Sequence, residues 1–307
     1  IKTDETVITM RQLLESLGDP LGQEPAVVID VNYPDFALPR NQLSDHQYVH
    51  ELAPFEWGTA KRLKQDKGYM GKMAFPENLD RPARTVMATM SASSREAMIL
   101  EYGPGRYRLP TVREAASMMS FPIDYRFYGS SRGIKHTLVG NAVPPKMSYA
   151  IAKAMARAEN VSVPDHYLPI HHDANIPFFN LNGIECTMNR ERPRRETAKF
   201  KYHIPYLIIN SYRVELTNYH SDFEKKLFHW TVEIHYSQGK KKACVFTPEV
   251  TRQIIDERYR AAINEFLAQQ PVVTFNEFQR AFCMTMTDRR ENNVLGPYEM
   301  LKRVREF

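Results

Sequence analysis

The chain has 307 residues, of which 43% are hydrophobic and 25% charged, enough to form two domains with buried cores. Its net charge of +5 permits a polyanionic partner such as DNA without requiring one. No run of about 18 apolar residues occurs and no signal peptide opens the chain, which argues against a membrane protein.

The first region, residues 1–80, opens with a short predicted helix and continues in irregular chain rich in prolines and polar turns. In TMRQLLESLG, Gly18 ends the helix and four apolar residues share one face: Met10, Leu13, Leu14 and Leu17. Long loops of this kind are often functional, and a plain linker is the alternative.

The second region, residues 81–160, is more regular. Residues 83–89 and 97–102 are expected to form short strands. A helix is predicted over 111–121, because Thr111 and Glu114 have the spacing of a capping box. A loop follows, over 124–133.

A second helix of this region is predicted after Pro144 and Pro145, preceded by a turn at Gly140-Asn141. The glycine would let backbone approach closely, since it has no side chain. The helix carries one apolar stripe: Met147, Ala150, Ile151, Ala154 and Met155.

The third region begins after a linker over 162–177 and predicts an α+β module. Three strands of a meander are expected, over 206–219, 227–237 and 240–248, with a turn at 220–226 between the first two. Two helices should follow, over 249–269 and 274–286, the second capped by Thr274 or Asn276.

The three cysteines form no CxxC pair, which argues against a disulfide framework or structural zinc and favours a cytoplasmic location. Cys244 and Cys283 are interpreted as buried small hydrophobes. His171, His172 and Asp173 could suggest a metal, but adjacent histidines usually point apart, so no metal site is predicted. The basic residues of the stretch 190–201 and Lys240–Lys242 either bind the phosphates of a nucleic acid or form solvated surface.

Two motifs in the second region resemble the ninth and tenth motifs of the DNA (cytosine-5) methyltransferases. The ninth is matched by Arg108, Thr111, Arg113, Glu114, Ala116, Phe121 and Pro122. The tenth is matched without a gap by GNAVPP, from Gly140 to Pro145, followed by the apolar helix. Ser117-Met118-Met119 departs from the Arg-Leu-Gln usual in the ninth motif.

The resemblance extends more weakly towards the start of the chain. RPARTVMATMS is similar to a segment of the family's target-recognition domain, and TVITMRQLLESLGDP to the stretch after the eighth motif. The resemblance therefore implies double-stranded DNA as substrate. It places four residues at the DNA: Thr85, Thr89, Ser91 and Arg95.

The resemblance implies a mixed α/β and α+β fold: a small target-recognition domain over 1–135, the last helix of a Rossmann-like methyltransferase domain over 136–160, and a C-terminal extension over 161–307. It implies S-adenosylmethionine as methyl donor, with Asn141, Ala142 and Val143 closing one wall of its pocket. Arg113 and Glu114 would hold the ninth-motif helix to the recognition domain without touching substrate.

The family's catalytic half is not found in this sequence. Its chemistry needs a cysteine thiolate in a Pro-Cys pair and a glycine-rich turn for the donor; here no cysteine follows a proline, GPGRY at Gly103 is not such a turn, and ENNV at Glu291 is read as a polar turn. The chain also begins at Ile1. We therefore expect the C-terminal part, or second subunit, of such an enzyme, inactive alone; a non-catalytic DNA-binding or assembly protein is the alternative. The DNA target and any restriction partner stay open.

Overall fold

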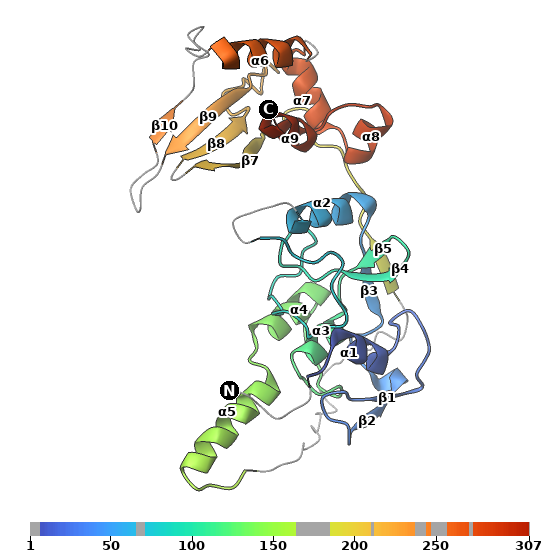
Figure 1. Ribbon diagram of the computed structural model, residues 1–307. Helices are drawn as coiled ribbons and strands as arrows, with labels where there is room; N and C mark the ends of the chain where they lie inside the picture. Colours follow the sequence, from blue (N-terminus) through green and yellow to red (C-terminus); the bar gives the residue numbers. More distant parts are fainter. Residues whose placement is uncertain are drawn as a thin grey trace. The chain divides into compact units, whose positions relative to one another are not determined.

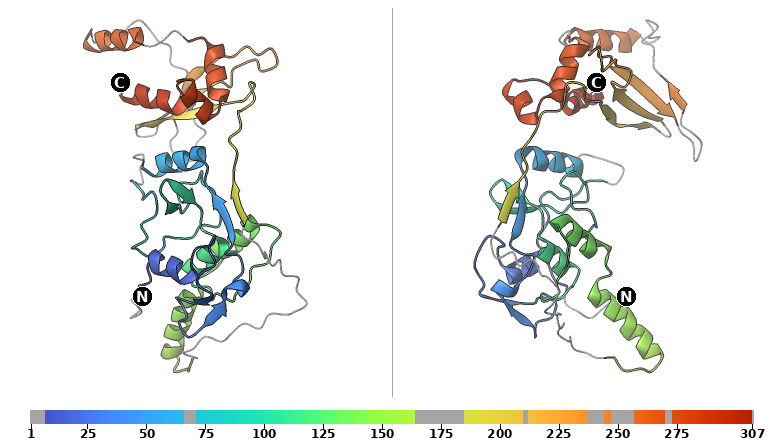
Figure 2. Two further views of the ribbon diagram at one scale, coloured as in Figure 1. Left: turned by 90° about the vertical axis from the view of Figure 1, so that its right-hand side faces the viewer. Right: turned by 180° about the vertical axis from the view of Figure 1, so that it is seen from behind.

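The computed structural model describes residues 7–65, 71–163, 185–209, 212–236, 244–246, 257–269 and 273–306. The chain divides into two compact units, Ile1–Arg190 and Glu191–Phe307 (Figure 1). This division lies later than the 160/161 boundary expected from the sequence, because β6 (Glu185–Met188) pairs in parallel with β3 (Tyr48–Glu51) of the first unit. Figure 2 shows the two strands side by side.

The first unit opens with α1 (Met10–Leu17), which confirms the first predicted helix. Thr9 and Gln12 form a capping box at its start, and Gly18 ends it at a φ of 73°. Its buried side chains are Met10, Leu13 and Leu17. Leu13 and Leu17 pack against Val28 in the hairpin formed by β1 (Val27–Ile29) and β2 (Ala37–Pro39).

The first unit also contains a four-stranded sheet of order β4-β5-β3-β6. In it, β5 (Arg106–Arg108) pairs antiparallel with both β3 and β4 (Leu100–Gly103), and β4 agrees in part with the strand predicted at 97–102. The 3₁₀ turn η1 (Arg40–Gln42) precedes β3, and α2 (Pro54–Gln65) follows it.

The strand predicted over 83–89 was wrong, since these residues join no ladder in the structure. Their backbone instead lies against the helix α4 (Arg132–Asn141). The Met87 carbonyl contacts the His136 ring, and Thr137 donates to the Ala88 carbonyl. Val86 is buried in the hydrophobic core shared with α3 (Val112–Met118). The apolar residues that suggested a strand therefore pack without a neighbouring strand.

The loop and turn predicted between 124 and 141 were also partly wrong. Residues 124–131 are irregular, but α4 spans Arg132–Asn141 and includes the Gly140-Asn141 pair that was expected to form a turn. Ser131 caps the helix by accepting a hydrogen bond from the Ile134 amide at 3.3 Å. A single glycine is tolerated inside a helix when packing requires it.

The helix predicted after the proline pair is confirmed as α5 (Pro145–Ala158). Within the described part of the chain, none of its side chains is buried. The predicted stripe is open to solvent, with Met147, Ile151 and Met155 at 56%, 39% and 65% exposure. A helix with one apolar face normally buries it against another element.

The second unit contains an antiparallel meander of order β10-β9-β8-β7. The predicted meander is confirmed, but the described residues of this unit form four of its strands: β7 (Lys201–Ile209), β8 (Tyr212–Thr217), β9 (Thr231–Tyr236) and β10 (Cys244–Phe246). The stretch read as one strand over 206–219 holds the end of β7 and all of β8. The turn expected at 220–226 is confirmed by the bridge between Asp222 and Leu227.

Four described helices follow: α6 (Glu257–Ala268), α7 (Phe275–Cys283), α8 (Met286–Glu291) and α9 (Pro297–Glu306). They confirm the helix predicted over 249–269 for residues 257–268, while 249–256 lie outside the described residues. Thr274, not Asn276, caps α7 through a capping box with Glu277. The asparagines of ENNV form the predicted turn after α8.

The core of the second unit lies between one sheet face and the C-terminal helices, around Phe200, Trp230 and Phe282. Cys283 is buried there as predicted. Cys244 is exposed, which corrects the prediction, because β10 is the edge strand of the sheet. Among the described residues, no helix is both long and apolar enough to cross a membrane. Most of the predicted linker, His171–Asp173 and Lys240–Lys242 lie outside the described residues.

Candidate functional site

The start of α3 is built around a buried ion pair between Arg108 and Glu114. Both guanidinium nitrogens Nη1 and Nη2 lie 2.7 Å from the carboxylate oxygens, and the Thr111 amide donates to Oε2 at 2.8 Å. Burial opposes the charge on both groups, yet the carboxylate raises the pKa of Arg108 and the guanidinium lowers the pKa of Glu114. The pair is therefore charged and fully enclosed.

Arg113, on the same helix, is fully buried and ties three segments together. It donates to the Ser44 carbonyl at 3.0 Å, to the Ser44 hydroxyl at 2.9 Å, and to the carbonyls of Pro122 and Tyr125. Burial lowers its pKa to about 10, which still leaves it protonated at neutral pH. Neither Arg113 nor Glu114 reaches an open surface.

Sequence reasoning missed the polar residues that surround this helix. The His46 ring lies 3.0 Å from the Gly18 carbonyl, and burial lowers its pKa to about 4. Asp45 accepts from Lys135 of α4 at 2.6 Å, and Asp30 accepts from the Ile123 amide at 2.9 Å. No local motif marks these residues, since each partner lies far away in the sequence.

Helix α4 packs directly against the backbone of residues 87 and 88. A Cβ atom at Gly140 would lie 2.4 Å from the Ala88 Cα and 2.6 Å from the Met87 carbonyl carbon. Gly140 therefore permits the close backbone approach that was predicted. The group that approaches it is the backbone of Met87 and Ala88. The start of the tenth motif thus supports the segment that resembles the target-recognition domain.

Thr85 and Thr89 are exposed on either side of Met87 and line a small cavity of about 20 Å³ together with His136. This is room for about one water molecule. Ser91 is partly exposed, with its hydroxyl 2.7 Å from that of Ser93. These hydroxyls are compatible with contacts to a phosphate backbone.

Arg95 differs from the other predicted recognition residues. Its guanidinium donates to the Leu63 carbonyl at 3.3 Å and to the Gly71 carbonyl. Its own carbonyl accepts from Lys64 at 3.0 Å. The side chain thus joins the loop over residues 89–95, called the recognition loop, to the end of α2.

The three residues expected at the methyl donor lie at the junction of α4 and α5. Asn141 is the exposed last residue of α4, and Val143 is 61% exposed. Ala142 packs on the core that contains Val86 and Val139. Asn141 and Val143 are consequently accessible to a ligand, while Ala142 fixes the junction.

Residues 8–157 match the family model of the C-5 cytosine-specific DNA methylases. Rice DNA (cytosine-5)-methyltransferase 1A (Oryza sativa subsp. japonica) is 35% identical over 100 residues, 33% of this chain and 6% of that protein. Type II methyltransferase M.AplI of Arthrospira platensis is 36% identical over 104 residues, 33% of this chain and 30% of its own length. The sea-urchin enzyme PliMCI (Paracentrotus lividus) is 50% identical over 48 residues, 16% of this chain and 3% of its own.

The chain therefore spans less than a third of the length of these relatives in each alignment. No solved structure matches the chain. The matched range contains α1, α3, α4 and nearly all of α5, so it includes the buried ion pair and the Gly140 contact.

Proposed function

We propose that residues 8–157 are the target-recognition and cofactor-closing portion of a DNA (cytosine-5) methyltransferase, from the C-terminal part or a second subunit of that enzyme. The whole enzyme transfers a methyl group from S-adenosylmethionine to C5 of cytosine in double-stranded DNA, in the cytoplasm. The family match over this range carries the proposal. The apolar face of α5, which no described residue buries, supports it, because such a face suits the sheet of a catalytic domain.

The cysteines of this chain support placing the nucleophile elsewhere. Attack on cytosine needs a thiolate, which forms readily only where the thiol pKa is lowered. Burial, with the nearby Glu51 carboxylate, raises the pKa of Cys186, and burial raises the pKa of Cys283. Cys244 lies at an exposed strand edge and follows Ala243, not a proline.

The other roles follow from this division. Asn141 and Val143 would face the donor, and Thr85, Thr89 and Ser91 would face DNA. Arg95 would position the recognition loop, since its guanidinium is bonded within the protein. Exposed basic residues of the second unit would add phosphate contacts: Arg192, Arg194, Arg195 and Lys199.

Replacing Asn141 by alanine should weaken donor binding by the complete enzyme about tenfold, the effect of one lost hydrogen bond to a ligand. The measurement is a calorimetric titration with S-adenosylmethionine of the enzyme containing both this chain and the Pro-Cys-bearing portion. Asn160→Gly is the matched control: it removes an exposed amide at a φ of 57°, which glycine adopts without strain. Unchanged donor affinity in Asn141→Ala would remove this residue from the pocket.

A further inference from the structure

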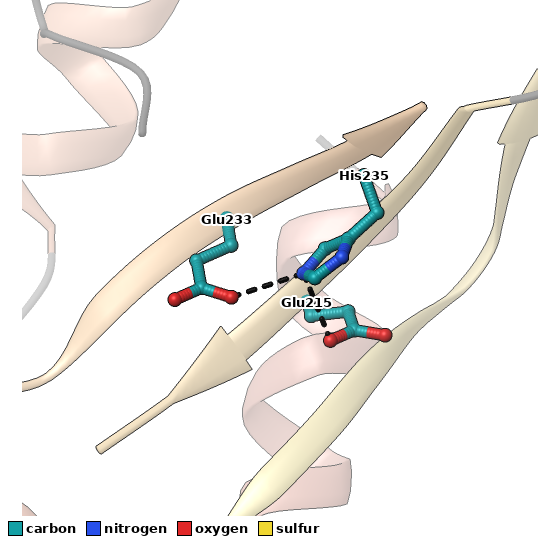
Figure 3. Close-up of side chains that lie close together, drawn as sticks. All are labelled: Glu215, Glu233 and His235. Carbon is teal, nitrogen blue, oxygen red and sulfur yellow. Dashed lines mark hydrogen bonds and ion pairs between the residues drawn. The ribbon is translucent and has the colours of Figure 1, made fainter. Parts of the chain in front are cut away.

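The two faces of the sheet in the second unit differ in chemistry. Val214 and Val232 pack into the apolar core with the C-terminal helices. Alternate residues of a strand point to opposite faces, so Glu215, Glu233 and His235 lie on the other side of the sheet. Figure 3 shows the three side chains converging from β8 and β9.

Two carboxylates oppose each other in this group. Glu215 and Glu233 are directly paired across β8 and β9, and like charges in such positions destabilise a sheet. The Glu215 side chain is fully buried, which increases the repulsion because water cannot screen it. This arrangement favours a positive centre between the two carboxylates.

His235 provides a nitrogen at that centre. Its Nε2 atom lies 3.0 Å from Glu233 Oε2 and 3.1 Å from Glu215 Oε2. A ring nitrogen carries a single proton, which points at one oxygen at a time, while an unprotonated nitrogen would direct its lone pair at two anions. A cation held by all three atoms satisfies the whole group.

We propose that Glu215, Glu233 and His235 form a binding site for a divalent transition-metal ion of the Zn²⁺ class. Their ligand atoms all lie within 4.8 Å of one another. Imidazole nitrogen and carboxylate oxygen are both zinc ligands, and the nitrogen favours Zn²⁺ over Mg²⁺. Three protein ligands would leave a position for water or a substrate oxygen.

Two partly exposed cationic side chains also contact Glu215 and would compete with a bound ion for its carboxylate. Lys201 Nζ lies 2.7 Å from Oε2, and Arg213 Nε lies 2.5 Å from Oε1. Their side chains are 37% and 46% exposed, against 13% for His235, so solvent screens them and they can turn outward. The three ligands are the enclosed members of the cluster.

Two further imidazoles flank the carboxylates on their outer oxygens. His203 Nδ1 lies 3.2 Å from Glu215 Oε1, and His220 Nε2 lies 3.0 Å from Glu233 Oε1. Groups that contact the far oxygens of ligating carboxylates orient them toward the ion. The Oε2 atoms of both carboxylates face His235, and Lys201 must leave Glu215 Oε2 when an ion binds there.

The test is a calorimetric titration of the untagged full chain with ZnCl₂ at neutral pH. Because other histidines and cysteines of the chain can bind Zn²⁺, the decisive quantity is the difference between wild type and variant. Glu233→Gln and His235→Gln are each expected to lose one bound ion per chain, or to bind it about tenfold or more weakly. MgCl₂, titrated in parallel, should bind this site more weakly than ZnCl₂.

His229→Gln is the matched control, since it removes an exposed imidazole of the same unit whose ring contacts Phe275 instead of the cluster. It should keep the wild-type stoichiometry. Circular dichroism of each variant tests whether the fold is retained. Glutamine is chosen to replace Glu233 because it keeps the shape of the side chain. Equal Zn²⁺ binding by wild type and both cluster variants, or none by wild type, would overturn the proposal in favour of a protonated His235 between the carboxylates.

Discussion

Replacing Glu114 by glutamine is expected to destabilise the first unit by about 3–5 kcal/mol, because the buried Arg108 loses its counter-charge. The side chains of the pair are only 6% and 1% exposed, so water cannot replace the lost partner. The measurement is urea unfolding followed by Trp57 fluorescence, with every variant in a Trp230→Phe background. The two tryptophans of the chain are divided between the units, so Trp57 alone then reports on the first unit.

The control for this substitution is Glu101→Gln, which alters an exposed carboxylate on β4 and should change stability by less than about 0.5 kcal/mol. Replacing Arg108 and Glu114 together by methionine should recover much of the loss, since no unpaired charge remains. A similarly small effect for Glu114→Gln and Glu101→Gln would contradict the enclosed pair.

Replacing Gly140 by alanine is expected to destabilise the first unit by about 3 kcal/mol, measured in the same way. In a helix this change normally stabilises by up to about 1 kcal/mol. Here the sign reverses, since the new Cβ would lie 2.4 Å from the Ala88 Cα, and backbone cannot turn aside as a side chain can. Helix α4 must then separate from residues 87 and 88.

Gly133→Ala is the matched control within the same helix. Its Cβ would meet only the Ser131 hydroxyl, at 3.9 Å, so this variant should be as stable as the wild type or slightly more so. If Gly140→Ala and Gly133→Ala had the same free energy of unfolding, the close packing of α4 on residues 87 and 88 would be refuted.

Local signals in the sequence were enough to predict several elements. The Thr111 and Glu114 capping box fixed the start of α3, and the proline pair fixed the start of α5. The predictions from the sequence were wrong or incomplete where contacts between distant residues determine the local structure. Gly140-Asn141 has the composition of a turn, but it forms the end of α4, where Gly140 packs on the backbone of Ala88. The pairing of β3 with β6 joins Val49 to Cys186, which no local pattern reveals.

The candidate site was predictable only where motif residues are consecutive or closely spaced. Arg113 and Glu114 belong to such a motif, as does Pro122, but Ser44 does not, although Arg113 donates to it, since it lies 69 positions from Arg113. His46 and the Glu215 cluster were missed for the same reason: their neighbours come from other strands or loops. The resemblance placed Arg95 at the DNA, and nothing local in the sequence could predict its bonds to residues 63 and 71.

We propose that this chain supplies recognition and cofactor closure to a cytosine-5 methyltransferase whose nucleophile lies elsewhere. The most direct test is transfer of tritium from labelled S-adenosylmethionine to double-stranded DNA, by the chain alone and by the chain combined with the Pro-Cys-bearing portion. We expect no incorporation by the chain alone and C5-methylated cytosine with both portions present. Incorporation by the chain alone, or none by the combined portions, would contradict it, the second result favouring a non-catalytic DNA-binding role.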